Sequence, residues 1–125
     1  MLYTSYIAKI NKLPNDIIKV IITRFLPKSL NINKYNNLYT MKELAPSKEL
    51  LLQYKKDNNW SNYIVNFKKE MNYRKDLHNK INSLYKYLQK GNSVCLICYE
   101  KDYLHCHRYL LAQYFMSKGI EWKEL

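Results

Sequence analysis

Glycine and proline are scarce in this chain, with 2 and 3 residues respectively among 125. This scarcity excludes collagen-like and low-complexity chains and argues against a disordered tail. No apolar run approaches the roughly 18 residues that a membrane-spanning helix needs. The first residues also lack the charged-then-apolar order of a signal peptide. We therefore expect a globular, cytoplasmic protein that makes no contact with a membrane.

Cysteine is also sparse, and its number, 3, is odd. In a chain that is not secreted, an odd number of cysteines favours reduced thiols over a disulfide framework. A chain of 125 residues can bury a core without disulfides or structural metals. We expect a single domain over residues 1–125 that contains no cofactor.

Acidic residues are few, 10 against 21 Lys and Arg, so the net charge is +11. Such a charge attracts phosphate groups, whether on nucleic acids, nucleotides or lipids. The basic residues are scattered from Lys9 to Lys123 with no run longer than two, which is equally typical of a solvated surface. The charge therefore favours an anionic ligand without indicating its size.

The apolar pattern predicts short strands. Apolar and β-prone residues favour a strand over 2–7, and a β-branched run favours a second over 17–23. Residues 93–98 have the composition of a buried central strand. The segment 25–46 shows no period, so we expect a long irregular loop there. Residues 120–125 are compatible with either a last strand or a tail.

Helices are expected between these strands. Ser47 is a candidate N-cap for a helix that ends near Lys56. Two further helices carry apolar stripes at a spacing of three and four, which we assign to the core, and Gly91 is placed to end the second of them. A fourth helix follows His105 and ends at Gly119. These elements predict an α/β fold, a small, mostly parallel sheet flanked by helices. The stripes consist of Trp60, Tyr63, Ile64, Phe67 and Met71, and of Leu77, Ile81, Leu84, Tyr85 and Leu88.

Polar residues gather where the predicted strands end. In open α/β sheets, ligands bind at the carboxyl ends of the strands, where the following helices point their N-termini. Such a helix end favours a phosphate or carboxylate, and an arginine there adds a planar, bidentate donor. We therefore predict an anion-binding pocket. Its candidate residues are Thr4, Ser5, Tyr6, Thr23, Arg24, Cys98, Glu100, His105, Cys106, His107 and Arg108.

Simpler structural roles stay open for these residues. Arg24 is compatible with a surface ion pair, and Glu100 with a solvated carboxylate or a structural partner of Arg24 or Arg108. Cys95 fits a buried strand as a small apolar residue. Cys106 differs, because a helix N-terminus flanked by histidines and an arginine is expected to lower the pKa of its thiol.

Two familiar arrangements are excluded. His105-Cys106 matches the start of a phosphatase loop, but that loop requires an arginine at the position that Ala112 occupies. Cys95-x-x-Cys98, followed by His105, Cys106 and His107, is spaced like a zinc site. Residues three apart in a strand point to opposite faces, however, so Cys95 and Cys98 would not converge on one ion. We therefore expect no metal, and we expect the strand to hold Cys95 and Cys98 away from Cys106.

One combination is specific: Cys98-Tyr99-Glu100-Lys101-Asp102 followed by Cys106-His107-Arg108. Together with Thr4-Ser5-Tyr6, Ile22-Thr23-Arg24 and Leu44-Ala45-Pro46-Ser47, it resembles the domain of unknown function 488 family, in its shorter branch. The resemblance extends from near the start to about Phe115. It implies a compact α/β fold and assigns the family signature to Cys98, Glu100, Cys106, His107 and Arg108, but it implies no agreed activity.

The leading functional hypothesis is a pocket for a nucleotide-like or other phosphate-bearing small molecule. The protein would either process this ligand or sequester it. Processing would use Glu100 as nucleophile or base on a glycosidic carbon, or Cys106 as a thiolate nucleophile. The alternative is a nucleic-acid-binding or nucleic-acid-modifying protein, based on the charge of +11 and on 13 tyrosines that could stack on bases.

Overall fold

The computed structural model describes all 125 residues as an α/β fold with one five-stranded sheet. The strands are β1 (Leu2–Tyr6), β2 (Ile18–Ile21), β3 (Leu38–Thr40), β4 (Val94–Cys98) and β5 (Trp122–Glu124). The α-helices are α1 (Lys48–Asp57), α2 (Trp60–Tyr73), α3 (Lys75–Gln89) and α4 (His107–Ser117). Short 3-10 helices are η1 (Ile7–Lys12), η2 (Ile32–Lys34), η3 (Lys42–Leu44) and η4 (Tyr103–His105). None of the helices combines the length and apolarity that crossing a membrane requires.

All neighbouring strands are parallel, in the order β3-β2-β4-β1-β5. β4 is central, as predicted, and all five of its residues are buried. Its register pairs Cys98 with Tyr6 of β1 and Ile97 with Ile21 of β2, so the three strands end at one edge. After β2 the chain continues to β3, and after β4 it continues to β5 on the opposite side. The crevice between β2 and β4 is thus a topological switch point, where open sheets bind ligands.

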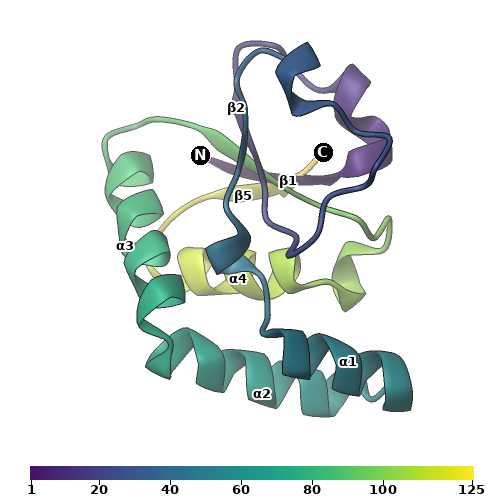
Figure 1. The fold of residues 1–125 in the computed structure, drawn as a ribbon. Helices are drawn as coiled ribbons and strands as arrows, with labels where there is room; N and C mark the ends of the chain where they lie inside the picture. The colour runs from purple at the N-terminus through teal and green to yellow at the C-terminus, as the bar shows by residue number, and fades with distance from the viewer.

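The two faces of the sheet are covered differently. The four α-helices pack on one face (Figure 1), where a large core joins them to strand residues such as Val20 and Leu96. On the other face, a smaller core of Ile21, Cys95 and Ile97 is covered by η1 and neighbouring loop residues. Alternation along each strand sends successive side chains to opposite faces, which explains the two cores.

The predicted helices are confirmed, with α1 capped by Ser47, whose hydroxyl accepts from the Leu50 N–H at 3.2 Å. Gly91 and Gly119 end α3 and α4 with φ of +89° and +86°, the left-handed region that favours glycine. The segment 25–46 is not wholly irregular, because it contains η2, β3 and η3. β3 is an edge strand of three residues, of which only Leu38 is buried. It is therefore too short to show the alternation of apolar and polar residues by which a strand is predicted from sequence. Residues 120–125 include an edge strand, β5.

Candidate functional site

A cleft of about 510 Å³ opens at the edge where β2 and β4 end. Its volume lies within the ordinary range for small-molecule sites. One wall comes from the ends of the two strands and the start of α4, and the other from α1 and α2. The lining residues are Thr23, Arg24, Phe25, Cys98, Tyr99, Glu100, His105, Cys106 and His107 on the first wall, and Pro46, Lys48, Leu51, Leu52, Tyr54, Lys55, Trp60 and Tyr63 on the second.

The predicted site residues fall into two groups. Those that line the cleft are Thr23, Arg24, Cys98, Glu100, His105, Cys106 and His107. The other four, Thr4, Ser5, Tyr6 and Arg108, are not among the lining residues. For Thr4, Ser5 and Tyr6 the difference follows from strand order, because β1 lies on the far side of β4 from β2.

The hydroxyls of Thr4 and Ser5 on β1 form hydrogen bonds with residues of β5 and with Leu125, which follows it. Thr4 Oγ1 donates to Glu124 Oε1 at 2.6 Å and accepts from Trp122 Nε1 at 2.7 Å. Ser5 Oγ donates to the carbonyl oxygen of Leu125 at 3.4 Å. Thr4 and Ser5 are both fully buried. These hydroxyls therefore link β1 to β5 and do not face the cleft.

Arg108 is fully buried and faces an internal carboxylate, which belongs to Glu124. Its Nε and Nη2 donate to the two carboxylate oxygens at 3.1 and 3.0 Å. Its Nη1 and Nη2 also donate to the backbone carbonyls of Glu100 and Lys101, at 2.6 and 3.3 Å. Burial is the largest single effect and opposes its charge. The hydrogen bonds and charge of Glu124, together with the charges of Cys106 and Cys98, outweigh burial and raise the pKa of Arg108. This placement differs from the expectation of an arginine that faces a ligand.

Hydrogen bonds fix the backbone of the loop after β4. The Arg108 guanidinium donates to the carbonyls of Glu100 and Lys101, and the Asp102 carboxylate accepts from the Leu104 N–H at 3.0 Å. His105 Nδ1 lies 2.7 Å from Asp102 Oδ2, and this hydrogen bond lowers the pKa of the Asp102 carboxyl. The exposed side chain of Glu100 makes no hydrogen bond or ion pair. The loop therefore presents a free carboxylate to the cleft on a fixed backbone.

A buried thiol–imidazole cluster lies at the base of the first wall. Cys98 ends β4, Cys106 is the N-cap of α4, and His107 is its first residue. His107 Nδ1 lies 3.8 Å from Cys98 Sγ and 4.0 Å from Cys106 Sγ. His107 Nε2 lies 2.9 Å from the carbonyl oxygen of Ile22. Because a carbonyl only accepts, Nε2 carries the proton in the neutral ring, and Nδ1 keeps its lone pair.

The two cysteines of this cluster have opposite pKa shifts. A hydrogen bond from Cys98, outweighing burial and assisted by His107, lowers the pKa of the Cys106 thiol well below its ordinary value. Burial, followed by the bond to Cys106, raises the pKa of Cys98 well above it. The expectation that the strand keeps Cys98 away from Cys106 is wrong, because β4 ends beside the start of α4. All three cysteines are free, and Cys95 lies in the core on the opposite face.

The second wall combines aromatic rings with cations. Trp60 and Tyr63 are stacked, with centroids 4.8 Å apart and planes 17° from parallel, and Tyr54 packs at 5.0 Å from Tyr63. Lys48 and Lys55 line the same cleft. The apolar stripe of α2 is core through Phe67 and Met71, as predicted, but its N-terminal end also serves the cleft. Sequence reasoning missed the α1 residues, since nothing local indicates that α1 faces the sheet edge.

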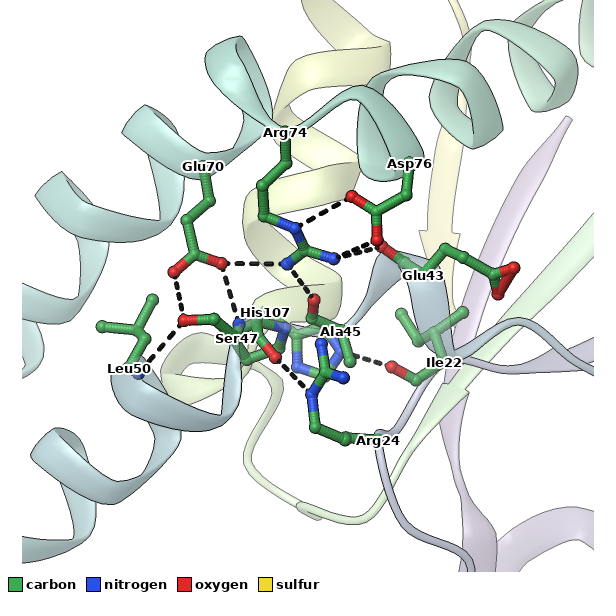
Figure 2. Close-up of polar contacts among 11 residues, drawn as sticks. Ile22, Arg24, Glu43, Ala45, Ser47, Leu50, Glu70, Arg74, Asp76 and His107 are labelled. Carbon is green, nitrogen blue, oxygen red and sulfur yellow. Dashed lines mark hydrogen bonds and ion pairs between the residues drawn. The ribbon is translucent and has the colours of Figure 1, made fainter.

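A buried polar network holds α1 in place (Figure 2). Glu70 accepts from the backbone N–H of Ser47 at 2.8 Å, from the Ser47 hydroxyl, and from Arg74 Nη1 at 2.9 Å. Arg74 also donates to the carbonyls of Ala45 and Glu43 at 2.8 and 3.1 Å. The backbone of 43–47 is therefore bound to α2 at several points. The network positions one wall of the cleft.

Comparison with known families assigns the chain. A family model described as "Active DUF488-N3 subclade" matches residues 2–119, which include every residue that lines the cleft. Comparisons with curated proteins and with solved structures give no match. Because the match spans nearly the whole fold, the chain belongs to the DUF488-N3a family.

Proposed function

We propose that the cleft binds a phosphate-bearing, nucleotide-like small molecule. One observation carries the proposal: stacked aromatic rings and several cations line a single cleft at the switch point of the sheet. Aromatic faces bind planar rings, and basic side chains bind phosphates. The three free cysteines favour a reducing compartment, so we further propose a cytoplasmic location.

Arg24 is the candidate phosphate ligand. It lies at the end of β2, half-buried, and its Nε donates to the carbonyl of Pro46 at 3.0 Å. That bond fixes the guanidinium while both Nη atoms remain without a protein partner. A preorganised guanidinium with free donors is suited to bidentate recognition of a phosphate. Lys48 and Lys55 add positive charge from the facing wall.

Glu100 is the candidate group for acting on a bound ligand. Its carboxylate lies free at the cleft, while its own backbone carbonyl is held by Arg108. A positioned carboxylate can serve as nucleophile or base at a glycosidic carbon. The second candidate, Cys106, is only 3% exposed, so a ligand would have to reach it deep in the cleft. Without turnover, the same cleft would sequester its ligand.

Calorimetric titration with nucleoside 5′-monophosphates, the parent nucleosides and inorganic phosphate tests the proposal. We expect the monophosphates to bind more tightly than either fragment. Arg24→Ala should weaken monophosphate binding by about 1.5–3 kcal/mol, the scale of a charge-assisted hydrogen bond, with little effect on nucleosides. Lys123→Ala, which removes the same charge from exposed β5, is the matched control.

The same experiment distinguishes the alternatives. Product formation that Glu100→Gln abolishes would identify an enzyme, whereas stoichiometric binding without product would identify a sequestering protein. Binding of oligonucleotides alone, with an affinity that falls steeply as salt rises, would replace our proposal with a nucleic-acid-binding function. Absence of monophosphate binding to folded protein would contradict it.

A further inference from the structure

We propose that Cys98, Cys106 and His107 form a zinc site at the base of the cleft, with one coordination position open to the ligand. The inference goes beyond the proposed nucleotide-like ligand and does not depend on it. It rests on the donor set, on the orientation of His107 and on the place of the three residues in the fold.

The donors are of the kind that zinc prefers. The three ligand atoms, one from each residue (two sulfurs and one imidazole nitrogen), lie within 4.8 Å of one another. Tetrahedral bond lengths of zinc to sulfur and nitrogen imply an S···N separation of about 3.6 Å. The observed separations from His107 Nδ1 to Cys98 Sγ and Cys106 Sγ, 3.8 and 4.0 Å, exceed that value by only a few tenths of an ångström. Small side-chain adjustments would bring the three donors onto one ion.

The imidazole already has the tautomer that a metal ligand requires. Figure 2 shows His107 directed at the carbonyl of Ile22, where β2 ends, and Nε2 lies 2.9 Å from that oxygen. The bond leaves Nδ1 with a free lone pair, and both sulfurs lie within 4.0 Å of that nitrogen. Cys98 Sγ lies slightly nearer to Nε2, at 3.5 Å, so a small rotation of the cysteine side chain would direct it to an ion on Nδ1. Metal-bound histidines almost always donate their other N–H to such a carbonyl or carboxylate. A residue outside the cluster therefore orients the ligand before any ion binds.

The charge balance and the burial around the three residues are also suited to a zinc ion. Two thiolates balance the charge of Zn²⁺, so the occupied site would add no net charge to the core. All three residues are buried, and the ring of Phe67 packs edge-on against His107 with centroids 5.8 Å apart. Both elements that carry the ligands, β4 and α4, belong to the central packing of the fold. Such a dry, rigid setting controls solvent access to a bound metal.

The three protein ligands leave the fourth coordination position of the ion open toward the cleft. Cys98, Cys106 and His107 all line the cleft, as do Glu100 and His105. Structural zinc sites have four protein ligands, whereas catalytic ones have three and leave one position for water or substrate. The open position would therefore admit a water molecule or an oxygen of an anionic ligand.

The sequence argument against a metal rested on the pair Cys95 and Cys98, which cannot converge on one ion. It is correct for that pair, since Cys95 lies in the core on the opposite face of the sheet. The second thiolate comes instead from Cys106, which lies beyond the loop that follows β4 and caps α4 beside the end of that strand.

Metal analysis of the purified full-length protein tests the proposal. The protein is produced with added zinc and purified under reducing conditions without chelator. Inductively coupled plasma mass spectrometry should then find one zinc ion per chain. X-ray absorption at the zinc edge should show two sulfur ligands and at least one nitrogen. Cys98→Ser, Cys106→Ser and His107→Gln should each reduce zinc to the background level. Cys95→Ser, a change of the same kind in the same strand, should retain one zinc per chain.

Three results would overturn the proposal. The first is wild-type protein that is isolated without zinc and fails to bind added Zn²⁺ or Co²⁺ under reducing conditions. The second is zinc bound only by oxygen and nitrogen, as at the exposed pair of His105 and Asp102. The third is a metal content that is unchanged in all three ligand variants. If the variants do not fold, the absorption spectrum of wild-type protein decides alone. Nucleotide binding is measured separately, so its failure and the failure of the zinc site are distinguishable.

Discussion

Arg108 of α4 and Glu124 of β5 form a two-point ion pair, Nε to Oε1 at 3.1 Å and Nη2 to Oε2 at 3.0 Å. The arginine side chain is 0% exposed and the glutamate side chain 17%. The same guanidinium holds the carbonyls of Glu100 and Lys101, so the pair also fixes the loop that reaches the cleft. Arg108, a residue of the family signature, thus does not line the cleft itself. Anchored by Glu124 of β5, it positions the backbone of the loop that carries Glu100.

Arg108→Ala should therefore lower the free energy of unfolding by about 3–5 kcal/mol, because it leaves a partly buried carboxylate without its partner. Urea denaturation measures the loss. The double variant Arg108→Ala, Glu124→Gln should be more stable than the single variant, since the stranded charge is gone. A single-variant loss below about 1 kcal/mol, the scale of an exposed ion pair, would contradict the structural role.

Trp60→Leu should weaken binding of a ring-bearing phosphate ligand by about 1–3 kcal/mol, the contribution of one aromatic stacking partner. Inorganic phosphate, which has no ring, should bind the variant and the wild type alike. Tyr73→Leu removes an aromatic ring from the exposed end of α2 and is the control, because Tyr73 is 68% exposed. Equal losses for the two ligands would mean that Trp60 supports the fold of the cleft and does not stack.

Ser47→Ala should destabilise the protein by about 2 kcal/mol, because it removes the N-cap of α1 and a hydrogen bond to the buried Glu70 carboxylate. Thermal and urea unfolding measure the change. Ser61→Ala, on the exposed side of α2, makes the same chemical change without a capping bond and should be nearly neutral. If both variants unfold alike, the network around Glu70 does not stabilise α1.

Asp76 should contribute to stability at neutral pH but not in acid. The hydrogen bond from Arg74 lowers the pKa of the Asp76 carboxyl in the folded state. A lowered pKa means that the contribution is complete above about pH 4, the ordinary value for an unfolded chain, and is lost as the pH falls through the folded-state pKa. Asp76→Asn should thus be less stable than the wild type at pH 7, and the difference should vanish once the pH has fallen below the lowered folded-state pKa of Asp76. Asp16→Asn, in an exposed turn, is the control, and a difference that persists in acid would contradict the assignment.

Local pattern accounts for the parts of the fold that the sequence predicts well. The buried run before Cys98, the stripe of α2 and the cap at Ser47 each express a preference that neighbouring residues decide. The predicted edge of the sheet is therefore correct, and the residues that follow β2 and β4 do meet at one cleft. The family resemblance is confirmed over residues 2–119.

Strand order accounts for the parts that the sequence does not predict. Only the tertiary fold shows that β5 lies beside β1, where Glu124 engages Thr4 and Arg108. Without that neighbour, a hydroxyl on β1 and an arginine at a helix start are indistinguishable from ligand-binding groups. The contact of Cys98 with the start of α4 depends on the path of the short loop between them, which the sequence does not indicate either. Long-range pairing, not composition, decides which polar residues are free.

The insertion of β4 between β1 and β2 has a consequence for how the chain reaches this fold. β1 and β2 are not neighbours, so they cannot join one sheet until β4, more than 70 residues further along the chain, has arrived between them. Contacts of such high sequence separation slow folding, because the loop-closure entropy is lost before the pairing is gained. We therefore expect α1, α2 and α3 to gain helical structure early, while sheet and cleft form together in one late, cooperative step.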